Sequence, residues 1–163
     1  MIEKSPPHIV RIDQLTDAFP NHSLVAFNRN PYANCSSILY RHHDPEAKRE
    51  ADRLRTVSKL AETWLLRSQW IRKWIEERNV TTFTYEEFCA DPATYVSKLA
   101  ANLAPLRTVD VNKSIKVKEY EKQGLMSFNP RQISKLSQDE IDAISRVLSE
   151  KAQLVSFFGY DIL

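Results

Sequence analysis

Apolar residues along the chain alternate between helix-like and strand-like spacing. Ile9, Val10, Ile12, Leu15 and Phe19 recur near helical spacing behind Ser5-Pro6-Pro7, which predicts a helix over about residues 7–18. After the turn-prone Pro20-Asn21-His22, the short run Leu24-Val25-Ala26-Phe27 predicts a strand buried on both faces. Such a strand is typical of a parallel sheet covered by helices.

Two helices should follow this strand. Pro31 predicts the start of one that runs to about His42, and Asp44-Pro45 predicts the start of a much longer one that ends near Arg78. An apolar stripe along the long helix predicts its core-facing side: Leu60, Trp64, Ser68, Ile71, Trp74 and Ile75. The charged residues of its first turns are expected to be mostly solvated: Lys48, Arg49, Glu50, Asp52, Arg53 and Arg55.

Thr81-Thr82-Phe83-Thr84-Tyr85 is rich in strand-forming residues and predicts a second parallel strand. Asp91-Pro92 then leads into a helix expected over about residues 93–103. Residues 105–131 show no clear period, so we expect a long excursion with one helical turn around residues 114–121.

The last part of the chain carries a clear helix-start signal. Ser137 with Glu140 three residues later predicts a capping box, and an apolar face follows it: Ile141, Ile144, Val147 and Leu148. The terminal Phe157-Phe158-Gly159-Tyr160 predicts aromatic rings docked on the core after a glycine stop. The expected fold class is therefore α/β, with short parallel strands and mostly helical content.

Composition narrows the possibilities. The chain has 163 residues with 42% hydrophobic content, which suits a single domain. A net charge of +2 is too mild to favour nucleic-acid binding. Cys35 and Cys89 lie far apart, so no disulfide framework is indicated and a reducing compartment fits best. We see neither a signal region nor an apolar run of roughly 20 residues that could span a bilayer, and we expect a cytoplasmic protein.

Candidate chemistry gathers at the end of the first strand. Arg29 follows this strand directly, and Ser37 lies eight residues further on in the next helix. A guanidinium and a hydroxyl so placed can reach one phosphate. Because the chain has only two glycines, no glycine-rich loop can wrap a phosphate in backbone N–H groups. The alternative is that Arg29 forms a salt bridge at the sheet edge and Ser37 is an ordinary helix residue.

Five segments, in this order, resemble the sulfotransferase family over essentially the whole chain: Glu3-Lys4-Ser5-Pro6, Arg29-Asn30-Pro31 with Ser37, Tyr85-Glu86-Glu87-Phe88 with Asp91-Pro92, Asn129-Pro130-Arg131-Gln132-Ile133, and Phe158-Gly159-Tyr160. The resemblance implies a P-loop-like three-layer domain. It also implies transfer of a sulfuryl group from 3′-phosphoadenosine 5′-phosphosulfate (PAPS) to an acceptor hydroxyl or amine, with no metal.

The resemblance further implies roles for individual residues. Arg29 and Ser37 would hold the 3′-phosphate of the donor. Lys4 would neutralise developing charge and Glu3 would orient the acceptor or take its proton, although a solvated chain end is an equal alternative. Tyr85 would lie near the nucleotide, or else pack in the core with its hydroxyl making one hydrogen bond.

Two further groups have competing interpretations. Ser127 and Arg131 would be donors from a loop that closes over the nucleotide, the alternative for Arg131 being an ordinary solvated side chain. His42-His43-Asp44 could suggest a metal site, but adjacent histidines point to different sides of a helix, and a solvated helix end is favoured.

Members of the family normally begin with a strand and a loop that grips the 5′-phosphosulfate, and nothing of this kind precedes Glu3. We therefore expect a domain truncated at its N-terminus, inactive or weak alone, with an exposed sheet edge open to self-association. The acceptor could be a small molecule, a carbohydrate or a lipid. The alternative function is a non-catalytic module that binds 3′-phosphoadenosine or another protein.

Overall fold

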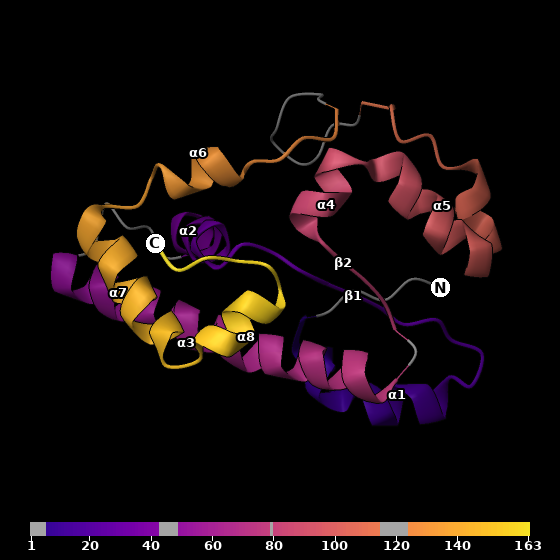
Figure 1. The fold of residues 1–163 in the computed structure, drawn as a ribbon, viewed down its shortest axis with the longest axis horizontal. Helices are drawn as coiled ribbons and strands as arrows, with labels where there is room; N and C mark the ends of the chain where they lie inside the picture. The colour runs from indigo at the N-terminus through magenta and orange to yellow at the C-terminus, as the bar shows by residue number, and fades with distance from the viewer. Residues whose placement is uncertain (1–5, 43–48, 79, 115–123) are drawn as a thin grey trace.

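Figure 1 shows the computed structural model of the chain, which describes residues 6–42, 49–78, 80–114 and 124–163. Strands β1 (Val25–Asn28) and β2 (Thr81–Thr84) form a two-stranded parallel sheet. Val25 pairs with Thr81 and Phe27 with Phe83. The expected α/β class, with short parallel strands among many helices, is confirmed.

The helices before and after β1 lie where the sequence predicts them. The first one begins as the 3₁₀ helix η1 (Pro6–Arg11) and continues as α1 (Ile12–Ala18). Helix α2 (Pro31–His42) opens on Pro31, and the Asn30 side chain caps it by accepting the backbone N–H of Ala33 at 3.1 Å.

Helix α3 (Glu50–Glu77) is the longest element, and it starts later than predicted. Asp44-Pro45 lies outside the described residues, and Arg49 has an extended backbone, with ψ 150°, so the start near Asp44 is wrong. Glu50 and Asp52 instead occupy the first turn, where carboxylates interact favourably with the helix dipole.

Strand β2 ends one residue earlier than predicted because Thr84 opens a helix. Its hydroxyl accepts the backbone N–H of Glu87, and the Glu87 carboxylate accepts the backbone N–H of Thr84 in return. Helix α4 (Tyr85–Ala90) therefore begins at Tyr85, and α5 (Pro92–Asn102) and the 3₁₀ helix η3 (Ala104–Thr108) follow it.

The C-terminal part contains α6 (Asn129–Ile133), α7 (Gln138–Ser149) and α8 (Ala152–Phe157). The capping box at Ser137 is confirmed. Helix α6 was not foreseen inside the excursion over residues 105–131, and the turn expected around 114–121 lies almost wholly outside the described residues. The final helical region is divided in two, because Lys151 at the start of α8 leaves helical geometry with φ −138°.

The main core lies between α2, α3, α7 and α8, which gather beside the sheet in Figure 1. In the predicted stripe of α3, Trp64, Ser68, Ile71 and Trp74 are buried, and Trp64 belongs to this core. The Trp64 ring meets Phe158 and Tyr160 edge-on, so the expected docking of the terminal aromatics is confirmed for these two residues. Phe157, by contrast, is 41% exposed.

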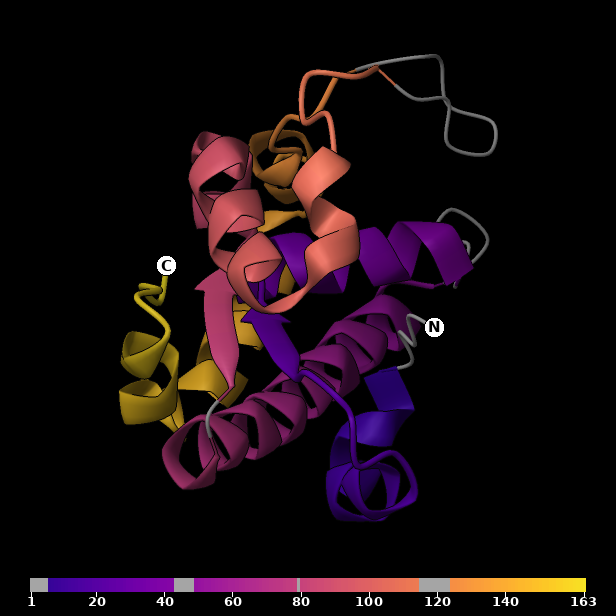
Figure 2. The same ribbon diagram turned by 90° about the vertical axis from the view of Figure 1, so that its right-hand side faces the viewer.

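The prediction that β1 is buried on both faces is wrong. Ala26 and Asn28 face α3, where Asn28 donates a hydrogen bond to Ser68, but Val25 and Phe27 are 41% and 49% exposed. Phe27 stacks on Phe83, which in turn contacts Phe88 of α4 and Tyr95 of α5, and Figure 2 shows these helices beyond the ends of the strands. Self-association through this strand stays a prediction. No helix among the described residues is both long and apolar enough to cross a membrane.

Candidate functional site

The candidate site lies at the carboxyl ends of the two parallel strands, a common position for ligand sites in open α/β sheets. Arg29 and Asn30 follow β1, and Tyr85 and Glu86 follow β2. Asn129, at the start of α6, and Tyr160, near the C-terminus, reach the same place from distant parts of the chain. The site is thus assembled from four separate segments.

The backbone of Arg29 is fixed on both sides. The indole N–H of Trp64 donates to the carbonyl oxygen of Arg29 at 2.9 Å, and the backbone N–H of Arg29 donates to the Asn28 side chain at 2.9 Å. The Asn28 amide in turn donates to Ser68 on α3 at 2.8 Å. The long helix therefore determines where the arginine leaves the sheet.

The guanidinium of Arg29 is held on its face and on one edge. Its central carbon lies 4.4 Å from the centre of the Tyr85 ring, a cation–π contact, and Nε donates to Oδ1 of Asn129 at 2.8 Å. Nη2 is buried and has no hydrogen-bond partner among the described residues. A buried donor without a partner is costly in a native protein, so the missing hydrogen bond makes this nitrogen a candidate for contact with an anionic ligand.

Glu86 is the hub of the surrounding hydrogen bonds. Its Oε1 accepts the backbone N–H of Asn30 at 2.9 Å and also a short hydrogen bond from the Asn129 side-chain amide. Its Oε2 accepts the Tyr160 hydroxyl at 2.8 Å. Burial, reinforced by the Glu86 carboxylate, raises the pKa of Tyr160 well above its usual range, so this phenol remains a hydrogen-bond donor.

Tyr85 joins the site to the segment that precedes α6. Its hydroxyl donates to the carbonyl oxygen of Met126 at 3.1 Å and accepts the backbone N–H of Phe128 at 3.2 Å. The expectation of one hydrogen bond is therefore wrong, since the hydroxyl makes at least these two. Burial raises the pKa of Tyr85, which keeps the hydroxyl neutral and able to make both bonds.

Among the described residues, no hydrogen bond joins the other candidate residues, Ser37, Ser127 and Arg131, directly to Arg29. Ser37 is half-buried on α2, while its neighbour Ser36 is fully buried and donates to the Gln132 carbonyl oxygen at 2.6 Å. Ser127 is exposed, and its hydroxyl accepts the backbone N–H of Asn129 at 3.4 Å. Arg131 is exposed on α6. Arg29 therefore has Tyr85 and Asn129 as its side-chain neighbours. Helix α2 contacts α6 through the hydrogen bond of Ser36.

Four of the candidate site residues singled out in the sequence lie outside the described part of the chain: Glu3, Lys4, His43 and Asp44. Within residues 6–42, 49–78, 80–114 and 124–163, no three His, Cys, Asp or Glu side chains gather closely enough to hold a metal ion.

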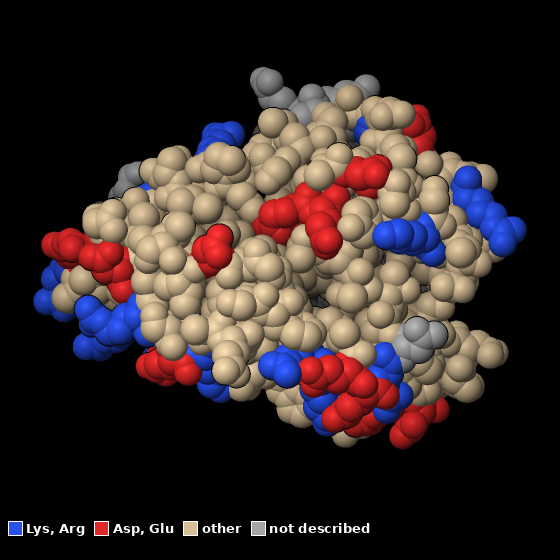
Figure 3. Space-filling view, viewed as in Figure 1, with Lys and Arg blue, Asp and Glu red and all other residues tan. Residues whose placement is uncertain are grey.

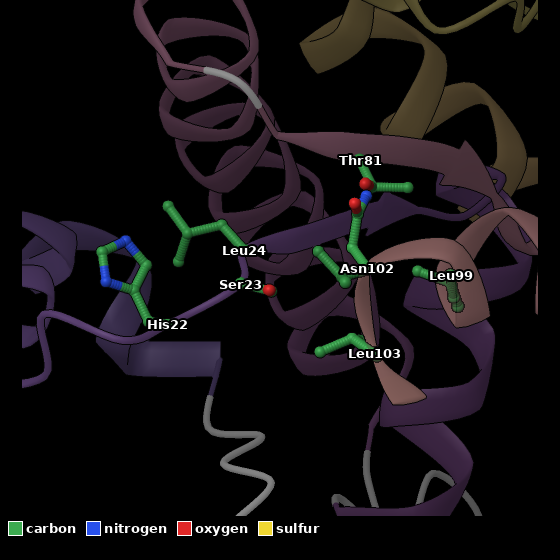
Figure 4. Close-up of a pocket in the computed structure, with 8 residues that line it drawn as sticks. His22, Ser23, Leu24, Thr81, Leu99, Asn102 and Leu103 are labelled. Atoms are coloured by element: carbon green, nitrogen blue, oxygen red, sulfur yellow. The ribbon is translucent and has the colours of Figure 1, made fainter. Parts of the chain in front are cut away.

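A cavity of about 350 Å³ lies at the opposite ends of the strands, away from Arg29. Figure 4 shows its walls, which come from the segment before β1, from the start of β2 and from the end of α5. None of the candidate residues lines it. On the face drawn in Figure 3, basic and acidic side chains are interspersed, and acidic ones cover the region of α4, whose first turn carries Glu86 and Glu87.

Sequence reasoning missed Glu86, Asn129 and Tyr160 as parts of the site. Each was nevertheless inside a segment that carried the family resemblance, directly after Tyr85, two residues before Arg131 and directly after Gly159. What the sequence did not reveal was that these segments meet, because Glu86 and Asn129 are 43 positions apart.

Comparison with known proteins agrees with this architecture. A model of the sulfotransferase family matches residues 1–104, which is more than half of the chain. The chain belongs to the sulfotransferase family. Arg29, Ser37 and Tyr85 fall inside the matched range, and Asn129 and Tyr160 fall beyond it. No curated protein and no solved structure matches the chain significantly.

Proposed function

We propose that this chain binds PAPS and, at most weakly on its own, transfers its sulfuryl group to the hydroxyl or amine of a small-molecule or carbohydrate acceptor. The observation that carries the proposal is Arg29 at the carboxyl end of β1, with a buried Nη2 that has no partner among the described residues. Family membership supplies the donor, and the free N–H groups of a fixed guanidinium suit its phosphate.

In this proposal Arg29 binds the 3′-phosphate of the donor as a charged fork, and Ser37 adds a neutral hydroxyl from α2. Tyr85 keeps the guanidinium in place through its ring. Ser127 and Arg131, both exposed near the start of α6, are further donors to the nucleotide. Glu3 and Lys4 belong to the acceptor side on the strength of the resemblance alone.

The chemical step balances without a redox partner. The acceptor oxygen or nitrogen attacks sulfur, and the bond between sulfur and the bridging phosphate oxygen breaks. The acceptor proton passes to a base, for which Glu3 is the candidate, and adenosine 3′,5′-bisphosphate leaves. Positive charge near the leaving phosphate lowers the barrier, and we propose that Lys4 supplies this charge.

Calorimetric titration of the 163-residue chain with adenosine 3′,5′-bisphosphate tests the donor site. We expect micromolar binding, weakened about 100-fold by Arg29→Ala because a charge-assisted hydrogen-bond pair is lost. Ser37→Ala should weaken binding less, since a neutral donor contributes less. Arg146→Ala, on the exposed side of α7, removes the same charge elsewhere and should leave binding unchanged.

Equal binding by the wild-type chain and Arg29→Ala would rule out the proposed 3′-phosphate site. Transfer itself is measured with sulfur-labelled PAPS and a panel of phenols, alcohols, amines and oligosaccharides. Binding that depends on Arg29 but occurs without transfer to any acceptor would support the alternative function, a non-catalytic 3′-phosphoadenosine-binding module.

A further inference from the structure

The contacts around Arg29 assign a function to two residues that do not reach the unpartnered nitrogen themselves. We propose that Asn129 and Glu86 are positioning residues, which fix the direction of the Arg29 guanidinium and thereby give the site its preference for a 3′-phosphate. This inference rests on the proposed function, because it concerns the same donor site.

The first step of the argument is geometric. The Tyr85 ring limits the position of the guanidinium on one side, and the hydrogen bond from Nε to Asn129 at 2.8 Å fixes the direction of its Nε edge. Together the two contacts determine where Nη2 points. An arginine held in this way loses less side-chain entropy when it binds an anion than a free one does.

The second step concerns charge. Arginine can only donate hydrogen bonds and carboxylate can only accept them, and the Asn129 amide lies between the two, its oxygen toward Arg29 and its nitrogen toward Glu86. A carboxylate bound directly to Arg29 would neutralise much of the charge that a phosphate needs. The amide transmits the position of Glu86 to the arginine and itself adds no negative charge.

The third step is that Glu86 is itself held. The backbone N–H of Asn30 at 2.9 Å and the hydroxyl of Tyr160 at 2.8 Å leave its carboxylate little freedom. Asn30 directly follows Arg29, so the same carboxylate fixes both the start of α2 and, through Asn129, the tip of the arginine side chain. Glu86 of α4 thus connects the segment after β1 with the start of α6.

The test compares two nucleotides that differ only in the group at issue, adenosine 3′,5′-bisphosphate and adenosine 5′-monophosphate. We expect Asn129→Ala to weaken binding of the bisphosphate about tenfold and to change binding of the monophosphate less than about twofold. The double variant Arg29→Ala/Asn129→Ala should bind the bisphosphate no more weakly than Arg29→Ala alone, because Asn129 acts through Arg29.

If Asn129 had a merely structural role, Asn129→Ala would weaken the binding of both nucleotides alike, or its effect would add to that of Arg29→Ala. Either result would overturn the inference. Asn102→Ala is the matched control, since Asn102 is exposed at the end of α5 beside the distant cavity. Thermal unfolding of each variant shows whether it is folded at the temperature of the titration.

Glu86 gives a second, independent pair of variants if Asn129→Ala does not fold. Glu86→Ala should reduce the preference for the bisphosphate, and Glu86→Gln should restore most of it, because glutamine keeps an oxygen for the Asn30 and Asn129 donors. Equal preference in both variants would contradict the inference. If the wild-type protein binds the two nucleotides equally well, the proposed function fails together with this inference. If the wild-type protein prefers the bisphosphate and the variants keep that preference, only this inference fails.

Discussion

At the scale of single residues, the Arg53–Glu140 ion pair departs most from what the sequence suggests. Glu140 was expected only as part of a capping box, yet its side chain is 1% exposed. One carboxylate oxygen accepts the backbone N–H of Ser137 at 2.9 Å, and the other binds two nitrogens of Arg53 at 2.8 and 3.0 Å. Arg53, expected to be solvated, therefore pairs with a buried charge.

We predict that Arg53→Ala lowers the free energy of unfolding by about 2–3 kcal/mol. The variant leaves the Glu140 carboxylate buried without its counter-ion, which costs more than the pair contributes when intact. Urea denaturation followed by circular dichroism measures the change.

Arg49→Ala is the matched control for this prediction. Arg49 also pairs with a carboxylate, Asp52, but its side chain is 87% exposed, so its removal should change the free energy of unfolding by no more than about 0.5 kcal/mol. Equal effects of the two variants would show that burial of Glu140 does not govern the energetics of its pair.

The positions of Arg29 and Tyr85 could be predicted because both follow recognisable strands, and parallel strands bring their carboxyl ends to one edge. The partners of Arg29 could not be predicted in this way. Asn129 lies 100 positions away in a segment without periodicity, and only tertiary packing decides which side chain of that segment reaches the sheet.

At the scale of elements, helices with a local sequence signal were more predictable than the burial of the strands. Capping boxes depend on residues a few positions apart, so Ser137 gave a reliable signal. The exposure of Val25 and Phe27 depends on what covers the sheet, which an apolar run alone does not determine. The interruption between α7 and α8 has no glycine or proline to announce it.

The end of α8 shows how one glycine places an aromatic side chain in the site. Gly159 has φ +74° and donates its backbone N–H to Ser156, and the next N–H, that of Tyr160, bonds to Val155. These two bonds form a Schellman motif, which reverses the chain at the helix end. The reversal directs Tyr160 toward Glu86.

We predict that Gly159→Ala lowers the free energy of unfolding by about 1 kcal/mol, because a side chain disfavours this left-handed conformation although there is space for it. Gly124→Ala is the control, since Gly124 is exposed, has no positive φ and would meet no neighbour. Thermal unfolding of both variants measures the difference. A loss as large in Gly124→Ala would contradict the explanation from backbone conformation.

At the scale of the whole molecule, the C-terminal tail ties separate layers together. The backbone N–H of Leu163 donates to the Tyr32 hydroxyl on α2, and its carbonyl oxygen accepts the Ser145 hydroxyl on α7. Tyr160 extends the same tail to Glu86 on α4. Removal of these contacts would therefore weaken the core and the candidate site together.

Tyr160 makes this connection sensitive to alkaline pH. Burial, with the Glu86 carboxylate next in importance, raises the pKa of the phenol far above its ordinary value of 10.0, whereas the unfolded chain releases the proton near that value. Above pH 10 the unfolded state thus binds fewer protons than the folded state, so the free energy of unfolding falls as pH rises, by up to about 1.4 kcal/mol per pH unit. Below pH 10 the contribution is fully present.

We predict that the free energy of unfolding of the wild-type chain falls more steeply between about pH 10 and 11.5 than that of Tyr160→Phe, measured by urea denaturation at each pH. The variant should be less stable at pH 8, because Glu86 loses a donor, and the two proteins should approach each other as pH rises. Other groups that titrate in this range are common to both proteins and cancel in the comparison. Parallel curves would show that the Tyr160 phenol does not keep its proton in the folded protein.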